Sequence, residues 1–481
     1  MNNLYRDAYK AGPVENGFTF DDDALKKALK RIYEKDVNVM NAIEENLFDA
    51  VFETMSGAVD KGFGVVGDTD PDIDFYKALK HDTAVFSAFK AHRWQNDIAR
   101  QLLDEKGELK NFERFKKDVD SLVNSRHKEQ WLKTEYDTAI LRARQAAEWR
   151  QFVREKDILP NLKWMPSTSI HPGNDHKIFW GTVRPIDDPF WDIHRPGDRW
   201  NCKCGLTSTD EPVTEVSQDT VRKERAHDGL ENNPGKDGKL FSDKHPYMSE
   251  AYPGAKEAVD ALTGRINEMI AEMPGNLTLG EKTDIARNNL KMEKALGMAK
   301  GKRMTYEEAN KGKENPQYKK GGGYHVNCQT CTVTHMLRRL GFDVEAKPNI
   351  GKSAFDEMKR QGITWEERFL NRDGTKPDYD YTFKWQVRKG YRVMNGKRLE
   401  EYFREKFSED GTYEIYCAWK GGSAHVFCAE VAGGKVRLFD PQNGKDDAGS
   451  YVRDMKAGCV GVIRIDNKLV NPKIAGLFIV K

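Results

Sequence analysis

The chain has 481 residues, which at roughly 150 residues per domain suggests about three domains and excludes a single small module. Its 78 Lys and Arg residues nearly balance its 76 Asp and Glu residues, and the resulting net charge of +2 argues against a dedicated nucleic-acid packaging protein. Hydrophobic residues make up 38% of the chain and aromatic residues 10%, so most of it has enough apolar surface to fold.

The N-terminal sequence and the cysteines predict where the chain is made and the state of its thiols. The first residues, Met1 to Asp7, contain no basic segment followed by an apolar one, and no apolar run is long enough to cross a membrane. We therefore expect synthesis in the cytoplasm, with neither a signal peptide nor a transmembrane segment. The seven cysteines form an odd and scattered set, which predicts reduced thiols, metal ligands or a nucleophile instead of a disulfide framework.

The first part of the chain is predicted to be mainly helical. Apolar residues recur at helical spacing in Leu25, Leu29 and Ile32, and residues 120–152 contain neither Pro nor Gly. We define residues 1–110 as a helical N-terminal region. After Pro160 the sequence is rich in Trp, Pro, His and Gly with short apolar runs such as 178–180, which predicts a small mixed cap of strands or extended loops.

Turn-forming residues are dense between 227 and 255, where we expect a loop. Helical patterns return at 255–273 and 280–300, so residues 251–320 are predicted to be a helical connector. The basic pairs at 116–117 and 319–320 are short enough to be ordinary solvated faces, and we expect no nucleic-acid partner.

Residues 321–481 are predicted to form an α+β module. A helix is expected at 329–340, ended by Gly341. Apolar runs follow at 413–419, 425–431, 436–439 and 459–465, and the first three are separated by Gly-Gly turns, which is typical of antiparallel hairpins. Cys417, Cys428 and Cys459 lie inside these runs, and we expect them in the core.

Cys328 stands where a helix is predicted to begin. A thiol in this position feels the positive end of the helix dipole and unpaired backbone N–H groups, which favour the thiolate and offer an oxyanion site. Cys328 is therefore the predicted nucleophile. Cys331 lies one turn further into the helix, where the dipole is weaker, and is the alternative nucleophile.

A nucleophilic thiolate needs a base, and His425 begins a predicted strand just after a Gly-Gly turn. Asp440 ends the next predicted strand, and an antiparallel hairpin would place it beside His425, where it can orient the imidazole. Gln442 follows two residues later and either donates a hydrogen bond in the site or only fixes the turn. The alternative is a small domain in which the buried Cys, the His at the start of a strand and the Asp in a turn only support the fold and have no catalytic role.

Four separated blocks of this module, at 327–331, 339–346, 424–427 and 439–444, contain the cysteine, histidine and aspartate positions. In sequence and in order these blocks resemble the papain-fold toxin domains of bacterial polymorphic toxins. The resemblance implies a papain-like fold and an enzyme of the cysteine peptidase or glutamine deamidase class, acting on a protein substrate without a cofactor. The Gln that papain-like peptidases carry upstream of the nucleophile is absent, because position 322 is Gly. A backbone donor or Gln442 would then serve the oxyanion.

The cap contains a second cluster of chemically capable side chains. His171, His176, His194, Cys202 and Cys204 are all potential ligands of a soft metal, and we expect a structural zinc ion bound by Cys202, Cys204, His171 and His194. Against this, paired Cys ligands usually stand roughly two to four residues apart, whereas only Lys203 separates these two. The alternative is that His194 and Trp200 simply pack in a small core.

The helix before the cap is followed by distinctive motifs around 187–204, 233–236 and 245–247. Together they make residues 110–250 resemble the phage Mu F-like head morphogenesis family, with Lys203 where many members have Arg. This resemblance implies a minor head protein of the virion, with phage portal and capsid proteins as partners. We take residues 111–250 as this domain.

The two resemblances in series predict a phage or prophage minor head protein that carries a cysteine hydrolase or amidase (a peptidase, deamidase or isopeptidase). Such an enzyme would act as a delivered toxin, and a cognate immunity protein is a further expected partner. The alternative function is a purely structural head protein whose C-terminal domain is inert or processes the capsid. The expected fold class is therefore multidomain, with a mainly helical N-terminal region, a small mixed cap and a C-terminal α+β papain-like domain.

Overall fold

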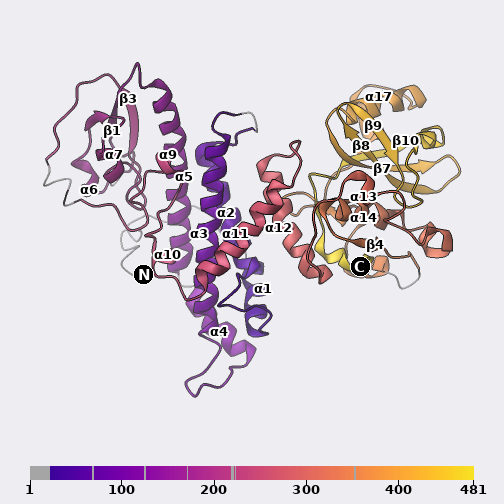
Figure 1. Ribbon diagram of the computed structural model, residues 1–481, viewed down its shortest axis with the longest axis horizontal. Helices are drawn as coiled ribbons and strands as arrows, with labels where there is room; N and C mark the ends of the chain where they lie inside the picture. Colours follow the sequence, from indigo (N-terminus) through magenta and orange to yellow (C-terminus); the bar gives the residue numbers. More distant parts are fainter. Residues whose placement is uncertain are drawn as a thin grey trace. The chain divides into compact units, whose positions relative to one another are not determined.

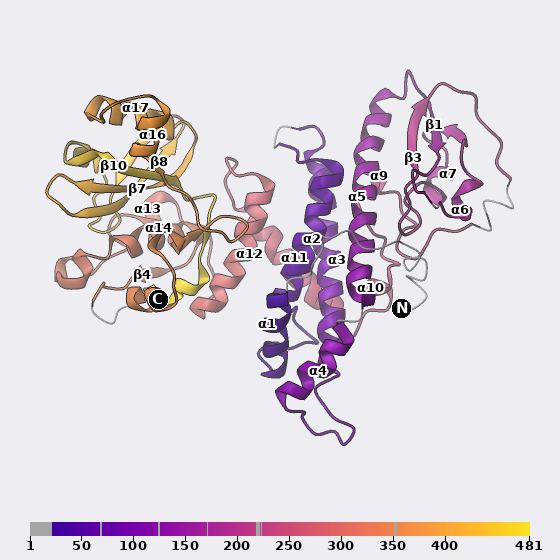
Figure 2. The ribbon, with the colours of Figure 1, turned by 180° about the vertical axis from the view of Figure 1, so that it is seen from behind.

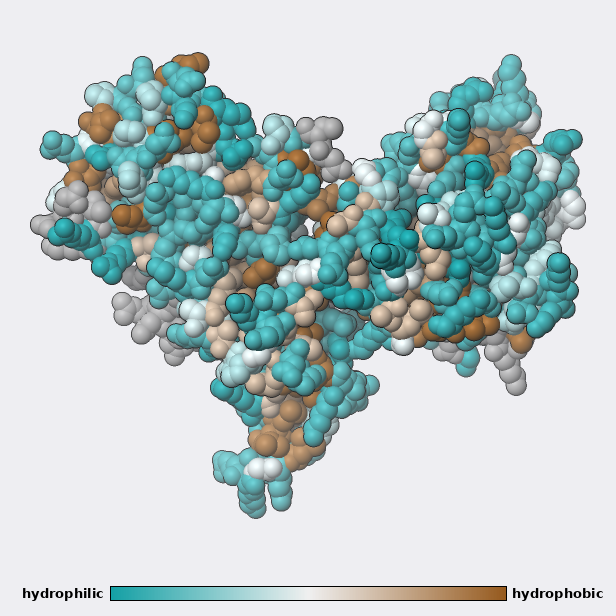
Figure 3. Space-filling view, viewed as in Figure 1, coloured by the Kyte–Doolittle hydropathy of each residue, from teal (hydrophilic) through white to brown (hydrophobic). Residues whose placement is uncertain are grey.

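The computed structural model describes residues 22–67, 70–123, 126–170, 172–217, 222, 224–350 and 354–481. The chain forms two compact units, Met1–Arg265 and Ile266–Lys481. The boundary between them falls within helix α11 (Ala255–Ala271). No helix in the described ranges is both long and apolar enough to span a bilayer. The face seen in Figure 3 is mostly hydrophilic, with hydrophobic residues in separate patches.

The first unit is mainly helical, as predicted (Figure 1). Helix α2 packs against three of its neighbours through a buried apolar face that includes Leu47, Val51 and Met55. Gly62 allows the close approach to α5, because a Cβ there would lie 2.3 Å from the Ile140 carbonyl oxygen. The helices of this part are α1 (Asp22–Tyr33), α2 (Glu45–Phe63), α3 (Ile73–Ala99), α4 (Phe112–Val123) and α5 (Arg126–Glu155).

A small mixed cap follows α5. Its antiparallel sheet has the order β2 (Val183–Pro185), β1 (Asn161–Met165), β3 (Gly205–Thr209). Two short helices, α6 (Asn174–Lys177) and α7 (Phe190–Ile193), complete it, while the apolar run 178–180 forms a turn and not a strand. The core of the cap consists of aromatic and aliphatic side chains, namely Trp149, Phe152, Leu162, Trp164, Phe179, Ile186, Phe190, Trp191 and Cys204.

Arg142 of α5 joins the cap to the chain that follows it. Its buried guanidinium donates hydrogen bonds to four backbone carbonyl groups, those of Gly197, Leu230, Asn232 and Leu240. Burial lowers the pKa of Arg142 to about 9. The predicted loop is thus an ordered segment, which also contains the short helices α9 (Pro234–Asp237) and α10 (Pro246–Ser249).

The second unit contains a five-stranded antiparallel sheet (Figure 2). Its order is β6 (Asp380–Tyr381), β10 (Met455–Arg464), β7 (Gly411–Trp419), β8 (Ala424–Ala432), β9 (Lys435–Phe439). The predicted hairpins form, with Gly-Gly turns between β7 and β8 and between β8 and β9. Two small sheets pair β11 (Leu469–Val470) with β5 (Phe369–Leu370) and β12 (Phe478–Val480) with β4 (Val344–Ala346).

Helices cover this sheet. The α-helices after α11 are α12 (Leu279–Leu296), α13 (Tyr306–Ala309), α14 (Cys328–Leu340), α15 (Ala354–Arg360), α16 (Thr382–Arg388) and α17 (Gly396–Lys406). The 3-10 helices are η2 (Tyr318–Lys320), η3 (Gly322–His325), η4 (Trp365–Arg368), η5 (Gly449–Arg453) and η6 (Pro472–Leu477).

Successive side chains of β7 point to opposite faces of the sheet. Ile415 belongs to the core that includes residues of α16 and α17, whereas Glu414 receives a hydrogen bond from Thr332 of α14. Helix α14 ends at Gly341, whose φ of 106° is in the left-handed region that favours glycine. The expected strand-rich α+β architecture of the C-terminal part is therefore present.

Candidate functional site

Helix α14 begins at Cys328, one residue before the predicted range of 329–340, and ends at Leu340 as predicted. The preceding residue, Asn327, is buried, and its side-chain amide donates to Asn315 Oδ1 at 3.3 Å and to the Lys347 carbonyl oxygen at 3.1 Å. These contacts fix the start of the helix. The Cys328 thiol is half-buried at this N-terminus, where the helix dipole favours a negative charge.

His425 and Asp440 meet as the hairpin pattern predicted. His425 is the second residue of β8, and Asp440 directly follows β9, which pairs with β8 in antiparallel register. His425 Nε2 lies 3.0 Å from Asp440 Oδ2. The Asp440 side chain is only 1% exposed, so this hydrogen bond is shielded from water.

The Asp440 carboxylate is held in place by three other donors. Oδ1 accepts from the Gln442 backbone N–H at 3.0 Å, and Oδ2 accepts from Asn443 Nδ2 at 2.8 Å and from the Tyr451 hydroxyl at 2.9 Å. Because these donors fix both oxygens, the carboxylate can fix the orientation of the imidazole in turn.

The electrostatic surroundings of His425 favour its charged form. Burial disfavours the imidazolium, but interactions with Asp440 and with Cys328 outweigh burial and raise the pKa of His425 to about 10. Cys328 thus lies near enough to the imidazole for its thiol to contribute to this shift. The structure therefore brings Cys328, His425 and Asp440 together into one cluster of side chains.

The other predicted members of this site lie deeper. Cys331 is fully buried, and burial raises the pKa of its thiol well above the ordinary value. The side-chain amide of Gln442 donates to Asn327 Oδ1 at 3.4 Å. Cys417 and Cys428 are in the core as expected, but Cys459 is exposed, so its predicted burial was wrong. The reason is a register shift in β10 between Met455 and Val460, which takes Cys459 out of the regular pairing with β7.

Arg368 forms a charged group next to α14 that the sequence analysis missed. Its guanidinium donates to the Gln329 carbonyl oxygen in the first turn, to Thr332 Oγ1 at 3.0 Å and to Glu414 Oε1 at 2.7 Å. Glu414 also accepts from the Tyr379 hydroxyl, and neither charged side chain of the ion pair is exposed. The signal that could have found this pair is Glu414 itself, an acidic residue within an apolar strand pattern.

A second buried pair lies further along the same helix. His335 Nδ1 is 2.8 Å from Glu314 Oε1, and both side chains are completely buried. Burial raises the pKa of Glu314 to about 8 and lowers the pKa of His335 well below its ordinary value. Burial thus disfavours the charged form of both groups.

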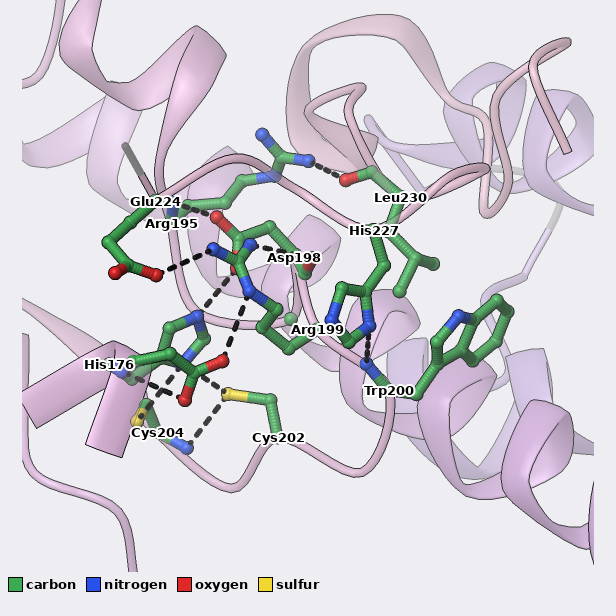
Figure 4. A network of polar contacts seen from close by, with 12 residues as sticks. His176, Arg195, Asp198, Arg199, Trp200, Cys202, Cys204, Glu224, His227 and Leu230 are labelled. Atoms are coloured by element: carbon green, nitrogen blue, oxygen red, sulfur yellow. Dashed lines mark hydrogen bonds and ion pairs between the residues drawn. The ribbon is translucent and has the colours of Figure 1, made fainter. Parts of the chain in front are cut away.

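The cap of the first unit contains a separate cluster, shown in Figure 4. His176, Cys202 and Cys204 place one nitrogen and two sulfur atoms within 4.8 Å of one another. His194, an expected ligand, is not in this cluster; it is buried and stacks on Phe179 with ring centroids 4.8 Å apart. His171 lies outside the described residues.

One comparison with known families bears on this part of the chain. Residues 96–207 match the family model described as Phage Mu protein F like protein. Among curated proteins and among solved structures, nothing matches the chain. The Mu F-like match supports a role in phage head morphogenesis and fits a component of the virion.

The Mu F-like segment runs from the end of α3 to β3, so it contains the His176, Cys202 and Cys204 cluster. It confirms the Mu F-like part of the predicted resemblance, although it begins and ends earlier than residues 110–250. Cys328, His425 and Asp440 lie outside the Mu F-like segment, in the second unit. The two clusters thus belong to different units.

Proposed function

We propose that this chain is a phage minor head protein whose second unit is a papain-like cysteine hydrolase or amidase. The single observation that carries the enzymatic part is the cluster of Cys328 with the His425–Asp440 pair. Cys328 is the first residue of a 13-residue helix, and the imidazole is linked to a buried carboxylate at 3.0 Å. A Cys, a His and an oriented acid in this arrangement are the parts of an activated thiol nucleophile.

The arrangement suits the cleavage of an amide bond. The Cys328 thiolate attacks the carbonyl carbon, and the His425 imidazolium then protonates the leaving nitrogen, which gives an acyl thioester and a free amine or ammonia. Water then attacks the thioester while neutral His425 takes its proton as general base, and the Cys328 thiolate leaves; this releases a carboxylic acid and restores the thiolate and imidazolium pair. Backbone N–H groups at the start of α14 are suited to stabilise the oxyanion.

Cys328 is the proposed nucleophile in preference to Cys331. The sulfur of Cys328 is half-buried and interacts with His425, whereas Cys331 is fully buried with a raised thiol pKa. A buried protonated thiol is inert toward a substrate. We therefore assign Cys331 a packing role in the core.

A papain-like fold is supported by the order and the placement of the three residues. The nucleophile starts a helix that packs against β8, the base lies on β8, and the acid follows β9. The two hairpins and the covering helix form an α+β arrangement in which Cys, His and Asp occur in this order along the chain. Gly322 in place of the upstream Gln is consistent with an oxyanion site built from backbone donors.

The Mu F-like match suggests a route by which such an enzyme would be delivered. A minor head protein that leaves the capsid with the genome would carry the fused unit into a recipient cell, where a hydrolase acts as a toxin. Portal and capsid proteins are the proposed partners of the first unit, a host protein is the proposed substrate of the second, and an immunity protein would protect the producing cell.

Expression of the full chain in a bacterium tests this function. We expect the wild type to slow growth and to leave cleaved or deamidated host proteins, detected by mass spectrometry. Cys328→Ala should abolish both effects, while Cys459→Ala, which changes an exposed thiol of β10, should retain them. Equal growth and unmodified host proteins for the wild type and Cys328→Ala would contradict the enzyme and favour a purely structural head protein.

A further inference from the structure

We propose that His176, Cys202 and Cys204 bind one zinc ion in the cap of the first unit, through Nδ1 of the imidazole and the two sulfur atoms. This set replaces His194 of the sequence-based expectation with His176. It is independent of the proposed hydrolase, because all three residues lie in the Mu F-like segment.

The separations between the donor atoms fit a tetrahedral zinc ion. Zinc binds sulfur at about 2.3 Å and imidazole nitrogen at about 2.0 Å, so tetrahedral angles place these two donors about 3.5 Å apart. The two measured values are 3.3 Å for Cys202 Sγ to His176 Nδ1 and 3.7 Å for Cys204 Sγ to the same nitrogen. A metal ion can therefore enter with only small side-chain movements.

A second contact selects the ring nitrogen that faces the sulfurs. His176 Nε2 lies 2.6 Å from Asp198 Oδ1, and the Asp198 side chain is completely buried. A proton on Nε2 donated to this carboxylate leaves the lone pair on Nδ1, directed at Cys202 and Cys204. A carboxylate behind a ligating histidine is a common feature of zinc sites, where it fixes the tautomer and the ring orientation.

Asp198 is itself held in place, so its role does not depend on a mobile side chain. Arg199 Nη1 lies 3.1 Å from Asp198 Oδ1, and Arg199 Nε lies 3.2 Å from Asp175 Oδ2 next to His176 in the chain. The Cys204 backbone N–H also donates to Cys202 Sγ at 3.4 Å, a contact that suits a thiolate ligand. In Figure 4 the sulfur atoms of Cys202 and Cys204 lie next to the ring of His176, with Asp198 and Arg199 beside it.

The donor set selects zinc among common divalent cations. Thiolate and imidazole ligands suit zinc, whereas magnesium and calcium prefer oxygen ligands. Two thiolates neutralise the charge of the ion, which lowers the penalty of burial. Three protein ligands leave a fourth position for water.

The ion would cross-link two parts of the small cap. His176 lies on α6 and Cys204 directly precedes β3, so the metal joins two short elements of the cap that are separated in the chain. The three strands have only five, three and five residues, and a core of this size gains stability from a metal.

Metal analysis of the full chain, purified without chelator, tests the proposal. We expect one zinc ion per chain in the wild type and none in the Cys202→Ser/Cys204→Ser double variant. Cys459→Ser and Cys328→Ala should keep the full zinc content, and the latter keeps this result separate from the test of the hydrolase. Folded wild-type protein that contains no zinc and takes up none when zinc is added would overturn the site.

Two further measurements cover the case in which the double variant fails to fold. Cobalt added to the zinc-free wild type should produce the absorption bands of a tetrahedral site with thiolate-to-cobalt charge transfer; octahedral bands alone would contradict the proposal. Asp198→Asn should weaken zinc binding roughly 10- to 100-fold in competition with a chelating dye, the usual effect of losing such a carboxylate. Unchanged affinity would contradict the proposed role of Asp198.

Discussion

The side-chain amide of Gln442 donates to Asn327 Oδ1 at 3.4 Å, and this contact joins the loop of the acid to the start of the nucleophile helix. Asn327 immediately precedes Cys328, and Gln442 stands two residues after Asp440. Both side chains are buried. The hydrogen bond therefore couples the position of the carboxylate to that of the thiol.

Substitution of Gln442 by Ala distinguishes this positioning role from a direct role at the oxyanion. Alkylation by iodoacetamide forms no oxyanion, so an oxyanion donor would not affect its rate. We expect Gln442→Ala to slow alkylation of Cys328 on the order of 10-fold, because small misplacements of reacting groups are costly. Peptide mapping by mass spectrometry follows Cys328 separately from the exposed Cys459. An unchanged alkylation rate would argue for the oxyanion role.

Asp440→Asn should lower the pKa of His425. The carboxylate is one of the groups that raise this pKa to about 10, and loss of an adjacent opposite charge should lower it by roughly 1 to 3 units. Nuclear magnetic resonance of labelled histidine measures the change, with His425→Gln used to assign the signal. Asp454→Asn, at an exposed position after η5, is the matched control and should leave the pKa of His425 unchanged.

Stability should fall as the pH rises, in part because of Glu314. Its pKa is about 8 in the folded protein, above its ordinary value of 4.5, so the folded state holds the proton more tightly than the unfolded state. The Glu314 contribution to the free energy of unfolding should therefore decrease between about pH 4.5 and 8, with a slope of at most about 1.4 kcal/mol per pH unit. His335, whose pKa is lowered from 6.5, opposes this change below about pH 6.5, so the pair should lower stability mainly between about pH 6.5 and 8.

Glu314→Gln removes this titration while keeping a donor toward His335. The variant should lack the Glu314 part of the slope, so its stability relative to the wild type rises with pH. Chemical unfolding followed at several pH values checks the difference. If the free energies of unfolding of the two proteins differ by the same amount at every pH in this range, Glu314 does not change its protonation on unfolding.

Arg368→Met should strongly destabilise the second unit. The substitution leaves Glu414 buried without its cation, which typically costs about 3 to 5 kcal/mol. Lys384→Met is the matched control, since Lys384 and its partner Asp378 are 42% and 84% exposed and such pairs contribute about 0 to 1 kcal/mol. Calorimetry of the full chain measures both variants. Equal unfolding temperatures for the two would contradict a structural role of the buried pair.

Residues at the ends of regular elements could be predicted from the sequence. Cys328, His425 and Asp440 each stand next to a boundary marked by an apolar pattern or a Gly-Gly turn, and antiparallel pairing then determines which ends meet. The partners that cross the fold could not be predicted. Arg368 reaches Glu414 from a 3-10 helix, and nothing in local propensity indicates that contact.

The ligand set in the cap shows the same limit. Four histidine and cysteine positions were named as zinc ligands from composition alone, but the structure places His176 and not His194 beside the two cysteines. The choice depends on how α6 and the turn after it pack on Trp164, whose ring lies 5.1 Å from that of His176. Such packing is a tertiary effect that neither spacing nor periodicity reports.

The buried guanidinium of Arg142 has a practical consequence for fragment design. Three of its four carbonyl acceptors, on Leu230, Asn232 and Leu240, lie beyond residue 207, where the family match ends. A recombinant fragment that ends at this residue would lack these acceptors and leave buried N–H donors of Arg142 without partners. We expect such a fragment to be insoluble. Boundaries for crystallisation or cryo-electron microscopy should therefore follow the hydrogen bonds of Arg142 and extend beyond Leu240.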